Sequence, residues 1–263
     1  MSKFDLKNKV DSAIYQAYNL ASDLLFYASI KKRKIARENE KLRGVSSAKR
    51  CFIIGTGPSL NDLPKCFLEH ISKEVSFGVN FLYKSDLFDQ IKPEYYVLMD
   101  DLFWSELSHV FADVKEKYQD VGPIFITDYR ARNLVEQEGL FLHAKNYPVN
   151  KIRLDLAGNS SALMNVTSYA IAAAIYLGFK EIYLVGCDYN AFCTNGVGHC
   201  YDDDELKESG LNLAYFLKFY HITTEIHYLL SAEAKRAGIK VINLTEGSLL
   251  DAYPRLSYKQ VRW

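Results

Sequence analysis

The chain has 263 residues, equal numbers of basic and acidic side chains (32 of each), and 49% hydrophobic residues. This length and composition fit one large α/β domain, or one domain with a small accessory region, and they exclude wholesale disorder because a full core can be built. The charge is uneven, because residues 1–50 hold 12 Lys or Arg and 5 Asp or Glu, whereas the remainder holds 20 and 27. Since an acidic main domain is not typical of a nucleic-acid binder, we predict no nucleic-acid partner.

The cysteines and the N-terminal residues indicate the compartment. Five cysteines lie at irregular spacings, and charges interrupt the early apolar residues. These patterns indicate neither a disulfide framework nor a cleavable signal peptide. No window reaches the ~18–20 uninterrupted apolar residues of a membrane span. We therefore expect a cytoplasmic protein, either in solution or peripheral on the inner face of the cytoplasmic membrane.

The first 50 residues predict a basic, amphipathic helical extension of a main domain at 51–263. Apolar residues recur at helical spacing from Ile14 to Ala28, no Gly or Pro precedes Gly44, and the stretch 31–43 is strongly basic. One long helix or two consecutive helices are therefore expected over 4–43. Two interpretations stay open: packing on the chain's own domain or on a second copy, or contact of 1–43 with an anionic membrane.

From Cys51 onwards, strands and helices are predicted to alternate. Short apolar runs predict strands at 51–54, 75–80, 95–99, 123–127, 181–186 and 240–244. Helical patterns lie near 61–70 and over 103–118, 129–138, 162–177 and 211–236, while 141–156 stays unassigned. This alternation predicts an α/β fold with a doubly wound, mostly parallel, Rossmann-like sheet forming a single nucleotide-binding domain.

The clearest helix signal is the segment 159–178. Asn159-Ser160-Ser161 precedes a long alanine-rich run, and Gly178 follows it. Ser and Asn favour helix starts and Gly favours helix ends, so a helix is expected between them. Ser160 suits an N-cap as well as it suits contact with a phosphate.

The turn Gly55-Thr56-Gly57-Pro58-Ser59 follows the first predicted strand and is the first candidate ligand site. Glycines let the backbone approach a ligand, and the start of a following helix favours phosphate. The turn lacks the dinucleotide fingerprint and the P-loop lysine, so a turn without a ligand is an equal alternative. Ligands of doubly wound sheets bind beyond the carboxyl ends of the strands. Those ends add Asn80, Asp100, Asp101, Thr127, Asp128, Gly186 to Asn190, and Asn243 as candidates, although Asn80 and Asp100 equally suit strand caps.

His199 and two groups of possible metal ligands complete the candidates. A histidine in a polar loop can act as a general base, although most lone histidines have no such role. Cys187, Cys193, His199 and Cys200 form no CxxC pair, so no protein-bound metal is predicted. Asp100-Asp101 resembles the acidic pairs that hold a nucleotide's divalent metal, but neighbouring residues of a strand point to opposite faces.

Three segments carry a resemblance to known families: Cys51–Leu60, Gly78–Tyr83 and Leu177–Asn190. They resemble the bacterial lipooligosaccharide sialyltransferases of glycosyltransferase family 42. They also resemble a broader set of surface-polysaccharide proteins related to archaeal 6-hydroxymethylpterin diphosphokinases. The resemblance covers approximately 51–256 and leaves the first 50 residues outside.

The resemblance implies a sialyltransferase-like glycosyltransferase. Such an enzyme moves a sugar from a nucleotide-activated donor, CMP-linked in those relatives, to a cell-surface glycan of lipopolysaccharide or capsule. The histidine that His199 matches deprotonates the acceptor hydroxyl in an inverting displacement without a metal site. The partners implied are a nucleotide-sugar donor and a glycan or glycolipid acceptor, and no cofactor.

The resemblance also implies which residues bind substrate. In the family, the glycine loop and the asparagine matched by Asn80 hold CMP. Thr56 stands where that loop has asparagine, and Asp100 where a cytidine-side asparagine is expected. The match further implies Gly55, Thr56, Gly57, Pro58, Ser59, Asn80, Asp100, Asn159, Ser160, Ser161, Asp188, Tyr189, Asn190 and Tyr201 as substrate-binding residues, with Tyr189 or Tyr201 replacing a phosphate-binding tyrosine.

Two other functions stay open. A Mg²⁺- and ATP-dependent diphosphokinase of the pterin type would move pyrophosphate and would place Mg²⁺ on Asp100, Asp101 or Asp188. A non-catalytic nucleotide- or glycan-binding subunit of an envelope-assembly complex belongs to a different class of protein. Turnover of a donor separates this subunit from either enzyme, and the need for Mg²⁺ separates the two enzymes from each other.

Overall fold

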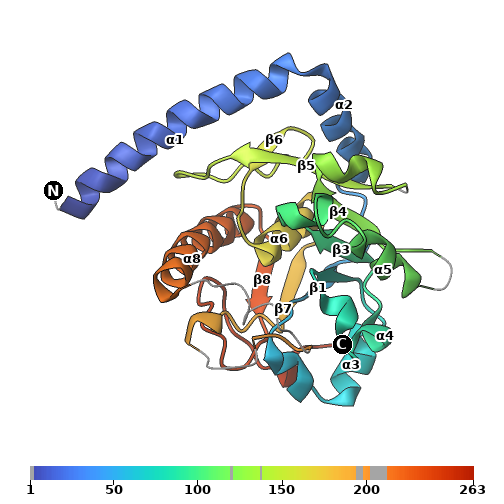
Figure 1. Cartoon of the computed structure of the whole chain (residues 1–263). Helices are drawn as coiled ribbons and strands as arrows, with labels where there is room; N and C mark the ends of the chain where they lie inside the picture. The colour runs from blue at the N-terminus through green and yellow to red at the C-terminus, as the bar shows by residue number, and fades with distance from the viewer. Residues whose placement is uncertain (1–2, 119–120, 137, 194–197, 202–211) are drawn as a thin grey trace.

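An eight-stranded, entirely parallel sheet forms the centre of the molecule (Figure 1). The computed structural model describes residues 3–118, 121–136, 138–193, 198–201 and 212–263. The strand order is β6-β5-β4-β3-β2-β1-β7-β8. The strands are β1 (Arg50–Ile54), β2 (Ser76–Val79), β3 (Tyr95–Leu98), β4 (Ile124–Asp128), β5 (Gly139–Asn146), β6 (Asn159–Ser161), β7 (Glu181–Val185) and β8 (Lys240–Asn243).

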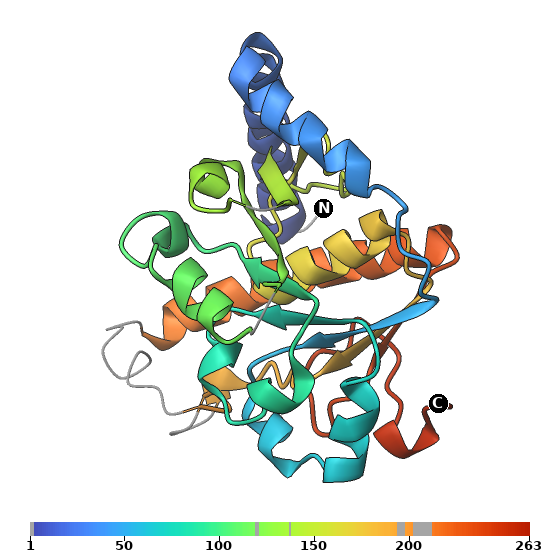
Figure 2. The same cartoon turned by 90° about the vertical axis from the view of Figure 1, so that its right-hand side faces the viewer.

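Helices cover both faces of the sheet (Figure 2). One face carries α6 (Val166–Leu177) and α8 (Leu213–Arg236), and the other carries α3 (Lys65–Ile71), α4 (Phe88–Ile91) and α5 (Val110–Glu116). Short 3-10 helices connect these elements: η1 (Asn39–Leu42), η2 (Pro58–Asp62), η3 (Leu82–Lys84), η4 (Asp101–Trp104), η5 (Tyr129–Asn133), η6 (Ala191–Cys193) and η7 (Tyr258–Gln260).

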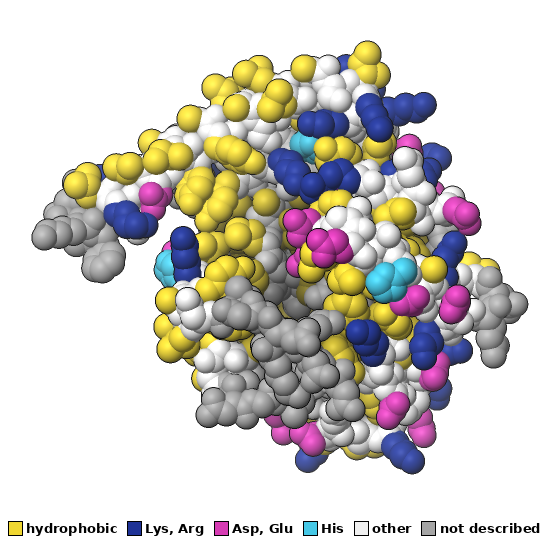
Figure 3. All heavy atoms as spheres, in the orientation of Figure 1, with side chains coloured by type: hydrophobic (Ala, Val, Ile, Leu, Met, Phe, Trp, Pro, Cys, Tyr) yellow, Lys and Arg dark blue, Asp and Glu magenta, His cyan; other side chains and the backbone are white. Residues whose placement is uncertain are grey.

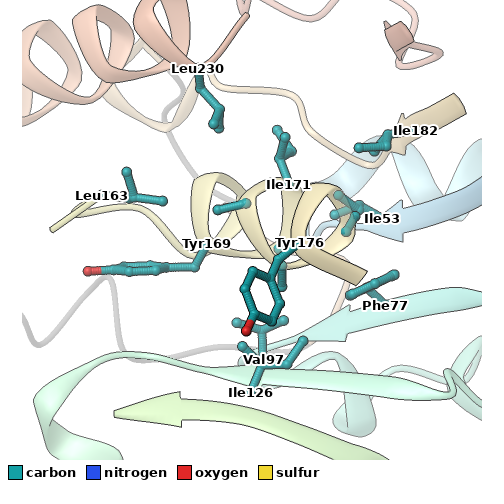
Figure 4. Packing of buried hydrophobic residues seen from close by; sticks show 14 of the residues in the cluster. Ile53, Phe77, Val97, Ile126, Leu163, Tyr169, Ile171, Tyr176, Ile182 and Leu230 are labelled. Carbon is teal, nitrogen blue, oxygen red and sulfur yellow. The ribbon is translucent and has the colours of Figure 1, made fainter. Parts of the chain in front are cut away.

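The sheet has two hydrophobic cores, one on each face. Side chains of a strand alternate between faces, so Ile53 packs beneath α6 while Phe52 and Ile54 pack toward α3. Burial on both sides explains why the strands are continuous apolar runs. Figure 4 shows Ile171 of α6 and Leu230 of α8 in the first core, together with side chains from the strands. The doubly wound, Rossmann-like α/β fold predicted from the sequence is confirmed.

The N-terminal segment forms two helices, α1 (Lys3–Ala28) and α2 (Ile30–Glu38). Ser29 separates them and caps α2, because its hydroxyl accepts a hydrogen bond from the backbone N–H of Lys32. Asn39, just after α2, is buried and hydrogen-bonds the backbone of Phe141 in β5. The second of these helices therefore packs on the edge of the sheet. Among the described residues, no helix combines the length and the apolar character needed to cross a membrane.

The expected helix start at Asn159-Ser160-Ser161 is wrong. These residues form strand β6, and the N-cap of α6 is Asn165, whose side chain accepts hydrogen bonds from the N–H groups of Thr167 and Ser168. The helix ends at Gly178, as predicted, in the left-handed conformation that favours glycine. Serine and asparagine side chains can cap a helix at any position where the helix begins. When several of them precede one helix, the local sequence does not show which one is the N-cap.

Three other boundaries differ from the prediction. The unassigned stretch 141–156 contains most of β5. The helical patterns over 103–118 and 129–138 shorten to η4 with α5 and to η5, respectively. Short segments such as these take their conformation from packing, because isolated helices of a few residues are unstable.

Candidate active site

The strand order of the sheet reverses direction between β1 and β7. The chain leaves β1 for β2 on one side and returns later to β7 on the other side. Both strands are parallel, so the turns after them, Gly55–Gly57 and Gly186–Asp188, lie at the same edge of the sheet. Ligands of doubly wound folds bind in the crevice at such a switch point.

A pocket of about 920 Å³ lies beyond the carboxyl ends of the strands. The molecule is hollowed beneath α1 in Figure 3, with acidic and basic side chains near the edge of the hollow. The lining includes predicted site residues from the strand ends and the polar loop: Gly55, Thr56, Gly57, Asn80, Asp100, Asp188, Tyr189, Asn190 and His199. Side chains from α1 and α8 form further parts of the wall.

The glycines of the first turn are required by the turn after β7. The N–H of Gly57 donates to the carbonyl oxygen of Gly186 at 2.8 Å. A Cβ at Gly57 would overlap the carboxylate of Asp188, and a Cβ at Gly55 would overlap the carbonyl oxygen of Gly186. The close approach that demands glycine is therefore to the neighbouring turn. The segment that follows is the 3-10 helix η2 of five residues, which offers a phosphate less dipole than the expected longer helix.

Asp188 brings a carboxylate to this turn. Ser59 donates a hydrogen bond from its hydroxyl to Asp188 Oδ2 at 2.7 Å. Burial raises the pKa of Asp188, and the hydrogen bond from Ser59 opposes that rise. When it is ionised, this carboxylate repels an unshielded phosphate and attracts a cation that could bridge to one.

Asn80 follows β2 in the left-handed conformation, with φ of 46°. Its backbone carbonyl accepts a hydrogen bond from the Tyr96 hydroxyl at 2.9 Å. Its side-chain Oδ1 is buried and has no hydrogen-bond partner among the described residues. A buried acceptor without a partner costs free energy, and a ligand that donates a hydrogen bond would remove that cost.

Unusual backbone conformations gather around the pocket. Outside glycine, the described chain has positive φ at four residues, and Asn80, Met164 and Tyr189 among them line the pocket. Asparagine adopts this conformation at little cost, whereas methionine and tyrosine rarely do. Such strain persists only where surrounding structure enforces it, and it clusters at binding and catalytic sites.

Asp100 and Asp101 both line the pocket. Adjacent residues of a strand would point to opposite faces, but β3 ends at Leu98, so Asp100 and Asp101 lie beyond it. Asp100 caps η4 by accepting a hydrogen bond from the N–H of Leu102 at 3.1 Å. Burial raises the pKa of Asp100, and the neighbouring Asp101 carboxyl raises it further. The two carboxyls therefore form one acidic side of the pocket.

Lys145 and Arg130 form a basic side, and sequence analysis missed both. Arg130 binds the buried Asp128 carboxylate with two hydrogen bonds, of 2.8 and 3.0 Å. Lys145 Nζ lies 3.8 Å from Asp128 Oδ2, and burial lowers the pKa of Lys145. Lys145 lies near the end of β5, so assigning a strand to the 141–156 stretch would have identified it as a strand-end residue.

His199 lines the pocket next to the first glycine turn. Its ring stacks on Tyr201, with centroids 5.0 Å apart and planes 7° apart. The N–H of Cys200 donates to the carbonyl oxygen of Thr56 at 2.8 Å, which ties this loop to the turn. An imidazole held beside a polar pocket can accept a proton from a bound hydroxyl group.

Six of the predicted substrate-binding residues do not line the pocket. Tyr201 is buried behind His199, and Pro58 and Ser59 lie in η2. Asn159 binds the side chains of Ser22 and Asp23 in α1. Ser160 is buried in β6, and the Ser161 hydroxyl accepts a hydrogen bond from the Arg153 N–H. The 159–161 residues thus connect β6 to its surroundings and lie outside the pocket.

Aromatic side chains distant in the sequence form the outer wall. Tyr15 and Tyr18 come from α1, and Phe219 and Tyr220 come from α8. Tyr15 stacks on Tyr147, with ring centroids 3.7 Å apart. No local signal places these residues near the glycine turn, because only the folding of α1 and α8 over the sheet brings them there.

The carboxylate side chains in the pocket suit a cation that is bound to a nucleotide better than a metal that the protein holds by itself. In the described parts of the chain, no three His, Cys, Asp or Glu side chains gather as ligands of one metal ion. Mg²⁺ bound to a nucleotide needs only one or two protein carboxylates, and it takes its other ligands from phosphates and water. Asp100, Asp101 and Asp188 all line the pocket, and one or two of them could supply these carboxylates.

Comparisons with known proteins agree with this architecture. The structure is similar to that of MAf glycosyltransferase from Magnetospirillum magneticum AMB-1, with a TM-score of 0.53 and 18% sequence identity. The similarity covers 88% of this chain but only 38% of that protein, so the chain spans well under half of its length. No curated protein matches the sequence. A family model described as 6-hydroxymethylpterin diphosphokinase MptE-like matches residues 26–193, which is more than half of the chain. This match includes α2, whereas the range of 51–256 expected from the sequence left α2 out. The chain belongs to the 6-hydroxymethylpterin diphosphokinase MptE-like family.

Proposed function

We propose that the protein is a glycosyltransferase that uses a nucleotide-activated sugar. The observation that carries this proposal is the grouping of the first glycine turn, Asn80 and His199 around one pocket at the switch point. The fold likeness to a solved glycosyltransferase agrees with it. From the sequence resemblance, a CMP-linked sialic acid is the first donor to test, with a lipopolysaccharide or capsule glycan as acceptor.

The two halves of the pocket suggest where donor and acceptor bind. The donor nucleotide would contact the Gly55–Gly57 turn and the Oδ1 of Asn80, which has no hydrogen-bond partner within the described part of the chain. Lys145 and Arg130 supply positive charge for its phosphate. The acceptor would lie against the aromatic wall of α1 and α8, because tyrosine rings offer both an apolar face and a hydroxyl.

The reaction would be an inverting displacement. His199 takes the proton of an acceptor hydroxyl, the hydroxyl oxygen forms a bond to the anomeric carbon, and the bond to the nucleotide phosphate breaks. The phosphate leaves with the bonding electron pair, and the basic side of the pocket stabilises its charge. His199 is catalytic in this proposal because it contacts the reacting hydroxyl.

A thermal-shift screen identifies the donor. CMP, UDP, GDP, ADP and their sugar conjugates are compared, because a ligand bound only by the folded state raises the unfolding temperature. The preferred base should give a clear rise, and Asn80→Ala should reduce it. If no nucleotide raises the unfolding temperature, the proposal fails.

Transfer assays then test His199. His199→Ala should lower the transfer rate about 10²–10⁴-fold while leaving donor binding unchanged. His109→Ala is the matched control, because His109 is exposed and lies outside the pocket lining. Transfer at the wild-type rate by His199→Ala would remove His199 from the mechanism.

A second candidate is pyrophosphate transfer from ATP, which the family membership and the acidic side of the pocket favour. Asp100, Asp101 or Asp188 would hold the nucleotide's Mg²⁺, which neutralises charge on the transferred phosphoryl groups. Formation of AMP from ATP and 6-hydroxymethylpterin, abolished by EDTA, would support this candidate. Sugar transfer that persists in EDTA would support the glycosyltransferase.

A further inference from the structure

Helix α1 turns an apolar face away from the protein. We define the outer face of α1 as Val10, Ala13, Ala17, Leu20, Ala21, Leu24, Leu25 and Ala28, which share one side of the helix. Leu20, Leu24 and Leu25 are 64%, 64% and 66% exposed. Figure 3 shows hydrophobic side chains along the outer edge of this helix.

The opposite face of α1 carries polar side chains together with Tyr15 and the buried Phe26, and its contacts hold the helix in this orientation. Asn19 exchanges two hydrogen bonds with the backbone of Tyr147, of 2.8 and 2.6 Å. Asp23 accepts hydrogen bonds from Arg153, Asn146 and Asn159. Although burial favours the protonated form of Asp23, these hydrogen bonds outweigh it and lower its pKa.

This arrangement reverses the usual amphipathic pattern, in which the apolar side of a helix faces its own domain. Asp23 is the only charged residue between positions 12 and 30, and it faces inward. The outer face is therefore an uncharged strip along most of the helix. Such a strip on a protein surface marks an interaction site.

The charges at the two ends of the strip identify its occupant. Lys9 is exposed at one end, and Lys31, Lys34 and Arg37 are exposed at the other. A second copy packed antiparallel about Leu20 would bring Lys9 near Lys31 of that copy, and a parallel copy would bring each lysine near itself. Like charges then meet in either arrangement, whereas anionic headgroups attract both ends.

We propose that the outer face of α1 lies on an anionic lipid surface. The apolar side chains would enter the boundary between headgroups and acyl chains, and the lysines at both ends would contact the headgroups. Ile14 and Tyr18 of this helix also line the pocket, so the lipid surface would lie beside the pocket. The proposal does not depend on which reaction the pocket performs.

Co-sedimentation with vesicles tests the proposal on the full chain. Vesicles of phosphatidylcholine alone are compared with vesicles that also contain phosphatidylglycerol, at low and high salt. The wild type should bind the anionic vesicles, and salt should weaken the binding. Leu20→Glu/Leu24→Glu should bind at least about tenfold less tightly, because two apolar side chains no longer leave water.

Two further variants separate the causes. Lys31→Gln/Lys34→Gln should weaken binding about 25-fold, at about fivefold per charge removed. Leu213→Glu/Leu217→Glu is the matched control, since both leucines are exposed on α8 and lie outside the proposed surface. This control should bind like the wild type, and circular dichroism should show that every variant is folded.

Several outcomes would overturn the proposal. Wild-type protein that stays in the supernatant with both kinds of vesicle refutes it, as does unchanged binding by Leu20→Glu/Leu24→Glu. A dimer in solution that these two substitutions dissociate, without vesicle binding by the wild type, would instead assign the outer face of α1 to a second copy. Equal binding to neutral and anionic vesicles would refute the role of the lysines.

Discussion

His227 should make the protein less stable in mild acid. This histidine is fully buried in α8, with Nδ1 3.0 Å from the Tyr253 hydroxyl and Nε2 3.2 Å from the Ser168 hydroxyl. Burial lowers the pKa of His227 to about 3, since the charged imidazolium would lose its hydration. The substitution that tests this is His227→Gln, which keeps a polar side chain but removes the titrating group.

The sign and size of the effect follow from the difference in pKa between the two states. In the unfolded chain, His227 has an ordinary pKa of about 6.5. Between these two values the unfolded state binds the extra proton, so the free energy of unfolding falls as the pH falls. Well above pH ~6.5 His227 causes no loss of the free energy of unfolding, and at pH ~5 the loss is about 2 kcal/mol.

Urea unfolding, followed by circular dichroism at pH ~7.5 and ~5, measures this loss. The wild type should lose about 2 kcal/mol more than His227→Gln between the two pH values. Any destabilisation that the substitution causes at both pH values cancels in this comparison. If both proteins lose the same free energy of unfolding, His227 either is protonated in the folded state or does not titrate differently on unfolding, and the reasoning is refuted.

Two further substitutions test packing near the site and at the edge of the sheet. Gly57→Ala should lower the free energy of unfolding by about 1–3 kcal/mol, because its Cβ would overlap the Asp188 carboxylate. Gly158→Ala is its control: the new Cβ would have only contacts of 3.7 Å or longer, so equal losses would contradict the crowding argument. Asn39→Ala should cost about 1–3 kcal/mol, because it leaves buried backbone groups without partners. Urea unfolding measures each loss, and exposed Asn133→Ala should stay within about 0.5 kcal/mol of the wild type.

Local sequence patterns were sufficient to predict strands and helices where the apolar runs or the terminal glycine gave one clear signal. The apolar runs at β1 and β7 were predicted close to their observed bounds, and so was the end of the alanine-rich α6 at Gly178. Strand ends in a parallel sheet share one edge, so the prediction also placed the first glycine turn, Asn80 and Asp100 on the same side of the molecule. These three features do line one pocket.

Local pattern failed where long-range packing decided the structure. Asn159 and Ser160 carry a helix-cap signal, yet they pair with β5 because an unpaired edge there accepts a strand. Lys145 is on the pocket wall only because the unassigned stretch that contains it joins the sheet as β5. Conformations of weakly patterned segments depend on their neighbours in space, which a window of sequence does not contain.

The amino-acid sequence by itself determined the α/β class, the parallel sheet and the turn at Gly55–Gly57, because helix and strand periods and glycine turns are set by residues close in the chain. Only the tertiary structure decided that α1 closes over the pocket and turns its apolar side outward. Asn19 reaches Tyr147 and Asp23 reaches Arg153 across more than a hundred residues. The apolar pattern of α1 was visible in the sequence, but the side of the helix that faces the protein depends on those distant partners.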